Sequence, residues 1–163
     1  MTSNGQEKPI RIIGLGNELR GDDAVGLLAA RRLRGRVGDR TEVIEAEMAG
    51  IEIVELMEGA RAVILIDAAR SGQAPGTIHR LDASASPIGS MVFPHSSHAI
   101  NAVDALELAR ALGTLPPTVI VYGIEAGDTE AGRPLSPQVA RALDEVVERI
   151  LQESETIACT NSI

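Results

Sequence analysis

The sequence predicts an α/β fold: a single three-layer domain in which helices cover both faces of a mostly parallel, twisted sheet of about five strands. Short aliphatic runs alternate along the chain with segments whose apolar residues recur at helical spacing, which is typical of this architecture. The 163 residues fit one domain. Hydrophobic residues make up 44% of the chain and aromatic residues only 1%, so the core must be aliphatic, as in strands buried on both faces.

Strands and helices are expected inside a domain that spans residues 10–152. The clearest strand is the run Ala-Val-Ile-Leu-Ile just before Asp67. The last helix is expected to have Ser136 as its N-terminal cap and Pro137 at its first position. The terminal segments are expected to be disordered, over residues 1–9 and 153–163. The expected strands are 10–15, 41–46, 62–66, 76–81 and 118–122, and the helices before the last are 24–33, 51–57 and 99–112.

Charge, hydropathy and cysteine content exclude several classes of protein. The formal net charge is −8 and the pI is about 4.9, so the surface repels phosphate backbones and no nucleic-acid partner is expected. No apolar run approaches the roughly 20 residues that span a bilayer. Cys159 is the only cysteine, which excludes a disulfide framework within the chain. We expect a cytoplasmic monomer with no membrane partner.

Acidic side chains and a histidine follow expected strands, where functional groups gather in open parallel sheets. Asp23 comes after the first strand, Asp67 ends the third, and His98 belongs to a loop that returns to the same edge. Two carboxylates and one imidazole form a suitable ligand set for a divalent transition metal such as nickel, zinc or iron. The sequence therefore indicates a metal site built from residues far apart in the chain.

Each of these residues also has a structural interpretation. Asp22 or Asp23 suits the N-terminus of the following helix, where a carboxylate caps backbone N–H groups. His95 competes with His98 for any role as a metal ligand. His79, in the expected edge strand, is interpreted as structural or exposed.

Common catalytic and nucleotide-binding motifs are absent. The Gly-Leu-Gly-Asn segment at residues 14–17 lacks the glycines of a dinucleotide fingerprint, and the chain has no Gly-Lys-Ser/Thr phosphate loop. It also has no His-Glu-x-x-His zinc-protease motif. Ser97 stands beside His98, but chain neighbours need not face each other, so a serine triad is not supported.

Four segments resemble the hydrogenase maturation proteases in the order typical of that family. Residues 14–26 read Gly-Leu-Gly-Asn-Glu-Leu-Arg-Gly-Asp-Asp-Ala-Val-Gly, which is similar to the family's Gly-x-Gly-Asn segment with its acidic pair and glycine. Leu65-Ile66-Asp67-Ala68 resembles the strand-end aspartate, His98 the histidine before a helix, and Ser136-Pro137 the start of the last helix. The resemblance covers residues 10–151.

The resemblance implies a metal-dependent endopeptidase with an aspartic-type site. Such enzymes remove a C-terminal extension from the large-subunit precursor of a nickel–iron hydrogenase after nickel insertion. By motif position Asp23, Asp67 and His98 are the metal ligands, and the nickel that they bind is presented by the precursor. Asn17 is a candidate to shape the first loop or bind substrate. Glu45 is a candidate substrate contact, in a Glu-Ala-Glu-Met segment that replaces the family's Asp-Gly-Gly-Thr-like turn.

The catalytic roles and one competing function stay open at this point. Either the metal polarises the scissile carbonyl, or a carboxylate of Asp23 or Asp67 acts as the base for an attacking water. The competing hypothesis is a noncatalytic nickel-checkpoint or chaperone protein that uses the same three ligands to bind the precursor without cutting it. A small-molecule hydrolase or nucleotide-binding domain is disfavoured by the missing phosphate loop.

Overall fold

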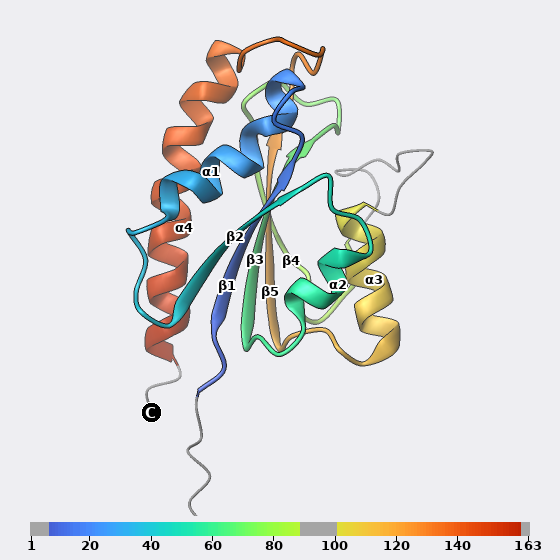
Figure 1. Cartoon of the computed structure of the whole chain (residues 1–163), viewed down its shortest axis with the longest axis vertical. Coiled ribbons are helices and arrows are strands. Elements are labelled where there is room, and N and C mark those ends of the chain that lie inside the picture. Colours follow the sequence, from blue (N-terminus) through green and yellow to red (C-terminus); the bar gives the residue numbers. More distant parts are fainter. Residues whose placement is uncertain (1–6, 89–100, 161–163) are drawn as a thin grey trace, which may run out of the picture.

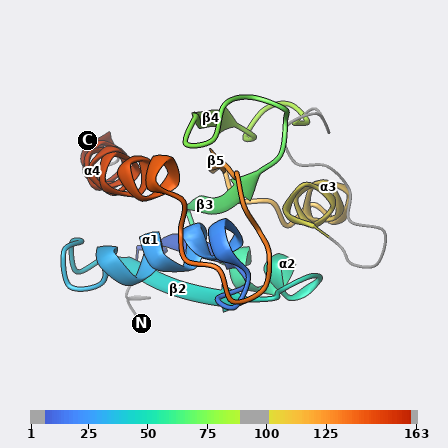
Figure 2. The same cartoon turned by 90° about the horizontal axis from the view of Figure 1, so that it is seen from above.

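Strands and helices alternate along the chain, and the computed structural model describes residues 7–88 and 101–160. The elements are β1 (Ile10–Gly16), η1 (Gly21–Ala24), α1 (Val25–Leu33), β2 (Thr41–Glu47), α2 (Glu52–Met57), β3 (Ala62–Ala69), β4 (Ile78–Asp82), α3 (Ala102–Leu112), β5 (Thr118–Glu125) and α4 (Pro137–Thr160). The five-stranded sheet has the order β2-β1-β3-β5-β4, with only β4 antiparallel to its neighbour. α1 and α4 cover one face, and α2 and α3 cover the other (Figure 1; Figure 2). The predicted three-layer α/β domain is confirmed.

Strand alternation divides the core into two aliphatic clusters. In β3, Val63 and Leu65 pack on the α2/α3 side, whereas Ile64 and Ile66 pack on the α1/α4 side. All four side chains are fully buried. By the same alternation, the next odd-numbered residue, Asp67, belongs to the α2/α3 face of the sheet.

α4 is longer than the sequence predicts, and the expected disorder of residues 153–163 is wrong as far as Thr160. The apolar face of the helix continues into this segment, where Ile157 packs on the α1/α4-side cluster. The Glu153 carboxylate accepts a hydrogen bond from the Tyr122 hydroxyl at 2.7 Å. Because of these contacts with the core and with β5, the segment is helical, although its polar composition alone suggests a free tail.

Other boundaries shift less. β3 and β5 run on to Ala69 and Glu125, beyond the ends expected for them. α3 begins after Asn101, whose side chain accepts from the Asp104 N–H at 2.9 Å in a capping box. The expected start of this helix at residue 99 lies outside the described residues, as do residues 1–6. In the part of the chain that the structure describes, no helix has the length and apolar character needed to cross a membrane.

The strand order switches between β1 and β3. From β1 the chain passes through α1 to β2 on one side, while β3 pairs with β1 on its other side. In open sheets of this kind, the connections at such a point leave in opposite directions and make room for a ligand at the carboxyl ends of the strands. Asp23 follows β1 and Asp67 lies near the end of β3, so the fold brings both to this switch point.

Candidate functional site

Two glycines bring the start of α1 directly onto the ends of β1 and β3. A Cβ atom on Gly26 would lie 2.3 Å from the Leu15 carbonyl oxygen and 2.4 Å from that of Ile66. A Cβ atom on Gly14 would lie 2.2 Å from the Gly26 carbonyl oxygen. No side chain fits at either position without displacing backbone. This close approach holds Asp23, just before Gly26 in the chain, over the switch point.

The loop between β1 and η1 is shaped by Asn17. Its side-chain oxygen accepts a hydrogen bond from the Leu19 N–H at 3.0 Å, as in an Asx turn. Its backbone N–H donates to the Asp23 carbonyl oxygen at 3.2 Å, and its carbonyl accepts from the Arg20 N–H at 3.2 Å. Of the two roles predicted for Asn17, shaping the loop is confirmed, and contact with substrate stays a prediction.

Asp22 is fully buried and joins this loop to the segment that follows β5. Its carboxylate accepts hydrogen bonds from the N–H groups of Gly127 and Asp128 at 2.8 and 2.9 Å, and from the N–H and hydroxyl of Ser136 at 2.7 and 2.8 Å. Burial alone would raise the pKa of Asp22, but these hydrogen bonds outweigh it and the pKa is lowered. η1 and α1 have no side-chain cap, so the helix-cap interpretation of the acidic pair is wrong.

Asp23 and Asp67 lie close enough for their charges to interact. Burial raises the pKa of Asp23, and the charges of Arg70 and Arg20 partly offset that rise. Burial, together with the charge of Asp23, raises the pKa of Asp67 to about 7, although its carboxylate accepts a hydrogen bond from the Ala68 N–H at 2.8 Å. Two acidic groups that repel each other at a partly desolvated edge form a site where a cation is favoured.

Comparison with known proteins identifies the family of this chain. Residues 27–153 match the family model described as hydrogenase maturation protease. The chain belongs to this family. The hydrogenase expression/formation protein HupD of Bradyrhizobium diazoefficiens is 26% identical over 151 residues, covering 88% of this chain and 79% of that protein. A putative hydrogenase maturation protease of Methanocaldococcus jannaschii is 28% identical over 151 residues, covering 91% and 97%. The structure of the hydrogenase maturating endopeptidase HybD from E. coli aligns with a TM-score of 0.79 at 26% identity, covering 91% of this chain and 93% of that one.

The third predicted metal ligand of this chain, His98, lies outside the described residues, and so does its competitor His95. Within residues 7–88 and 101–160, no group of three His, Cys, Asp or Glu side chains could hold a metal ion. The described structure therefore brings Asp23 and Asp67 together and leaves the histidine ligand a prediction.

His79 has a structural role in this chain. Its Nε2 lies 3.1 Å from the buried Glu125 carboxylate. The same carboxylate accepts hydrogen bonds from the Ser71 N–H at 2.8 Å and hydroxyl at 2.9 Å. The network thus fixes the turn after β3, which carries Arg70, and it agrees with the structural interpretation of His79.

Glu45 lies on β2 with its carboxylate engaged by α1 and the residue that follows it. One oxygen accepts from Arg31 at 2.8 Å and the other is 3.2 Å from Arg34. Glu45 is in register with Gly14, so it belongs to the α1 face of the sheet. Contact between Glu45 and the substrate stays a prediction, and in this structure it would require the two ion pairs to open.

Proposed function

We propose that this maturation protease cuts a C-terminal extension from the large-subunit precursor of a nickel–iron hydrogenase. The observation that carries the proposal is the meeting of Asp23 and Asp67 at the ends of neighbouring strands, where the charge of one raises the pKa of the other. Paired carboxyl groups at such a site bind a metal ion or take the proton of an attacking water. Family membership supports peptide hydrolysis as the reaction.

His98 is the residue proposed to complete the site. It precedes Asn101, the N-terminal cap of α3, by a length of chain that reaches at most about 11 Å. α3 runs back along the sheet toward the start of β5, so its N-terminus lies toward the edge where β1 and β3 end (Figure 1). α3 and Asp67 also share one face of the sheet. An imidazole from this segment would add the nitrogen ligand that suits nickel better than oxygen ligands alone.

Nickel enters the proposal as part of the substrate, carried by the precursor. Two carboxyl groups with raised pKa values fit it, because a divalent cation between them removes their repulsion. Bound there, nickel would orient the precursor and polarise the scissile carbonyl. One carboxylate, of Asp23 or Asp67, accepts the proton of the attacking water and returns it to the leaving amine.

Exposed apolar side chains on the same rim fit a substrate as large as a protein. Leu19 in the loop after β1 is 72% exposed, and Met48 and Ile51 after β2 are 77% and 55% exposed. Apolar groups gathered on the surface of a small domain mark sites where other proteins bind. Met48 also has a φ of 51°, which is unusual for a residue other than glycine. Docking of the precursor on this rim would cover these side chains.

The proposal is tested by incubating the protein with nickel-loaded and nickel-free precursor and weighing the products by mass spectrometry. We expect only the loaded precursor to lose the mass of its extension. His98→Ala should abolish this cleavage, whereas the comparison variant His95→Ala should retain more activity. Cleavage by His98→Ala at the wild-type rate would remove His98 from the site. Binding of the precursor without any shortening would identify the noncatalytic nickel-checkpoint protein instead.

A further inference from the structure

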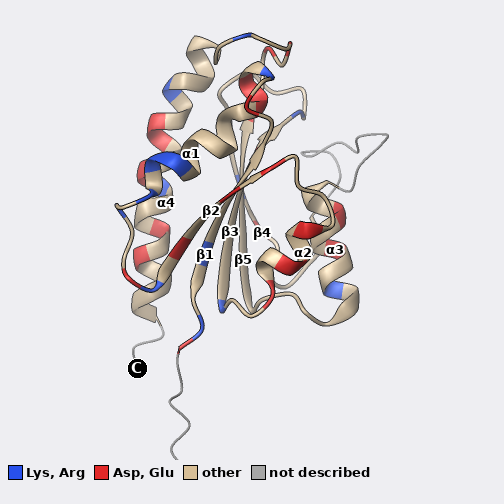
Figure 3. Ribbon diagram, viewed as in Figure 1, with Lys and Arg blue, Asp and Glu red and all other residues tan. Residues whose placement is uncertain are grey.

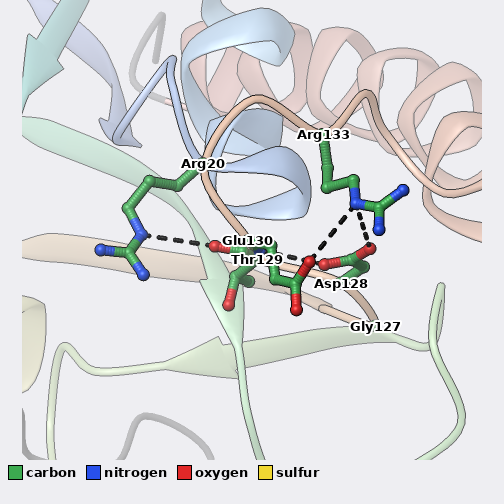
Figure 4. A pocket seen from close by; sticks show the side chains of 6 residues that line it. All are labelled: Arg20, Gly127, Asp128, Thr129, Glu130 and Arg133. Atoms are coloured by element: carbon green, nitrogen blue, oxygen red, sulfur yellow. Dashed lines mark hydrogen bonds and ion pairs between the residues drawn. The ribbon is translucent and has the colours of Figure 1, made fainter.

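A cavity of about 410 Å³ lies beside the proposed catalytic site, between the loop after β1 and the loop after β5. Figure 4 shows the side chains of Arg20 and Arg133 on opposite sides of the close-up, with those of Thr129 and Glu130 between them. Charged and polar residues dominate the walls, so the cavity suits a charged or strongly polar group. It is lined by Arg20, Gly127, Asp128, Thr129, Glu130 and Arg133.

Hydrogen bonds between the two loops hold these walls in place. The Asp22 N–H donates to the Asp128 carbonyl oxygen at 2.8 Å, and the Asp22 carboxylate accepts from the Gly127 N–H at 2.8 Å. Further along, the Gly132 N–H donates to the Leu19 carbonyl oxygen at 2.9 Å. A binding site on rigidly joined segments loses little entropy when a ligand binds. The cavity is therefore a preformed feature of the fold.

Arg20, which lines this cavity, and Arg70, which reaches the lining residue Thr129 from the turn after β3, have no acidic ion-pair partner among residues 7–88 and 101–160. Arg20 Nε donates to the Thr129 carbonyl oxygen at 3.3 Å, and Arg70 Nη2 donates to the Thr129 hydroxyl. Most other arginines in that part of the chain are paired with Asp or Glu, as Arg133 is with Asp128. The chain has 23 acidic and 15 basic residues, and acidic groups recur on α2, α3 and α4 (Figure 3). Arg61 and Arg141 also lack an acidic partner in the described part of the chain, but only Arg20 and Arg70 converge on one residue, Thr129. Two guanidinium groups that converge without a carboxylate between them, in so acidic a protein, indicate a site for a carboxylate from outside.

The chain places both arginines near the proposed catalytic site. The Asp23 N–H donates to the Arg20 carbonyl oxygen at 3.0 Å, and Arg70 directly follows β3, which carries Asp67. An anion held by both arginines would therefore lie near the ends of β1 and β3. Neither Nη atom of Arg20 makes a hydrogen bond to the described residues, so both are available to such an anion.

We propose that Arg20 and Arg70 form a carboxylate-binding subsite for the peptide segment that this protease cuts. The inference rests on the proposed function and adds a recognition element to it. A guanidinium binds a carboxylate through two parallel N–H···O bonds, which fix orientation as well as position. The carboxylate comes either from the free end of the C-terminal extension or from an Asp or Glu side chain within it. Its capture beside Asp23 sets how far the scissile bond lies from the metal-bound end of the substrate.

The test compares Arg20→Gln and Arg70→Gln with the wild-type protein in cleavage of nickel-loaded precursor. We expect each variant to raise KM about tenfold, with a smaller change in kcat, because the lost contact serves binding in ground and transition states alike. Arg20→Lys keeps the positive charge but loses the paired N–H donors of the guanidinium. Its KM should lie between those of the wild-type protein and Arg20→Gln. The matched control is Arg141→Gln, an exposed arginine of α4 outside the site, which should leave KM unchanged. If the two arginines served only to offset the charge of Asp23, both Gln variants would keep the wild-type KM. That result would overturn the proposal.

Two altered precursors distinguish the sources of the carboxylate. One ends in a carboxamide, and the other has the acidic residues of its extension replaced by Asn or Gln. We expect one of them to raise the wild-type KM about tenfold and to show no further rise with Arg20→Gln. Wild-type kinetics on both would overturn the proposal.

A binding measurement separates failure of this inference from failure of the proposed function. If the wild-type protein cuts no precursor, the proposed function fails. Equilibrium affinity for the nickel-loaded precursor then reports on the subsite alone. About tenfold weaker binding by Arg20→Gln and Arg70→Gln, but not by Arg141→Gln, would support the subsite, and equal affinities would overturn it.

Discussion

Ser136 donates both its N–H and its hydroxyl to the carboxylate of Asp22, at 2.7 and 2.8 Å, although 114 residues separate the two in the chain. The carbonyl of Ser136 in turn accepts the first-turn hydrogen bond of α4, from the Ala140 N–H at 2.9 Å. One carboxylate therefore joins the loop after β1 to the start of the last helix. The two members of the acidic pair therefore differ: the Asp22 carboxylate is used to join the two segments, and Asp23 is the member to which the proposed function assigns a role.

Asp22→Ala should destabilise the fold severely. The substitution leaves the part-buried N–H groups of Gly127, Asp128 and Ser136 without their charged acceptor, for a loss of about 3 kcal/mol in the free energy of unfolding. Urea denaturation at pH 7 measures this loss. The control is Asp144→Ala, which removes an exposed carboxylate on α4 and should change stability far less. Equal losses in the two variants would contradict the bracing role of Asp22.

Wild-type stability should also respond to Asp22 at acid pH. The folded pKa of Asp22 lies below the ordinary value of 3.8, so the folded state favours the ionised form. The stabilisation is fully present above about pH 4 and is lost as the pH falls through the lower, folded value. Asp22→Asn should therefore show a shallower loss of stability between pH 4 and pH 2 than the wild-type protein, measured by urea denaturation across that range.

Gly26→Ala should disturb both the fold and the site. The new methyl group would meet the carbonyl oxygens of Leu15 and Ile66 at 2.3 and 2.4 Å, forcing α1 away from the sheet at a loss of about 2–4 kcal/mol. Since α1 positions Asp23, cleavage of precursor should fall as well. Gly38→Ala is the control, because a Cβ at Gly38 meets nothing within 4 Å. Thermal unfolding of both variants measures the difference in stability. A Gly26→Ala protein as stable as Gly38→Ala would show that the close approach of α1 to the sheet is not required.

Much of the fold was predictable because local patterns determine it. The aliphatic run at 62–66 is buried on both faces, and Pro137 begins α4 as its position predicts. The end of α4 was not predictable from composition. Its last turns are ordered by partners distant in sequence, such as Tyr122, which donates to Glu153. A polar segment reads as a tail until such long-range contacts are known.

The candidate site was likewise predictable only as far as local sequence patterns reach. The rule that functional groups gather at strand ends selected Asp23 and Asp67, because it depends only on where strands stop. The role of Asp22 depends on Ser136, 114 residues away, and no local signal separates it from Asp23. The subsite arginines were missed for a similar reason: an arginine without an acidic partner can be recognised only once the fold shows which side chains surround it.

Ending the chain after residue 152 should destabilise the protein although the removed segment looks like a tail. The truncation leaves the Tyr122 hydroxyl without its acceptor and removes the Glu153 partner of Arg80, bound at 2.7 and 2.8 Å. It also exposes core covered by Ile157. We expect the Tm to fall by roughly 5 °C or more. A chain that ends after Thr160 is the control and should unfold like the full protein; equal Tm values for the two truncations would show that the last turns of α4 are dispensable.

Asp67→Asn should stabilise the metal-free protein above neutral pH. Burial and the charge of Asp23 raise the pKa of Asp67 from its ordinary 3.8 to about 7 in the folded state. Because the folded pKa exceeds the unfolded one, the folded state binds the extra proton, and wild-type stability falls as the pH rises between these two values. Asparagine has no charge to bury, and its side-chain oxygen can still accept from the Ala68 N–H.

Thermal unfolding with a chelator present, at pH 5 and pH 8, measures the effect of Asp67→Asn. The variant should gain roughly 4–8 °C over the wild-type protein at pH 8 and less at pH 5. Asp82→Asn is the control: the hydrogen bond from Ser84 lowers the pKa of Asp82, so its loss should not stabilise the protein at either pH. A gain for Asp67→Asn that is the same at both pH values would mean that the charge of Asp67 is not what destabilises the fold. A gain confined to high pH would show that the negative charge of Asp67 destabilises the metal-free fold.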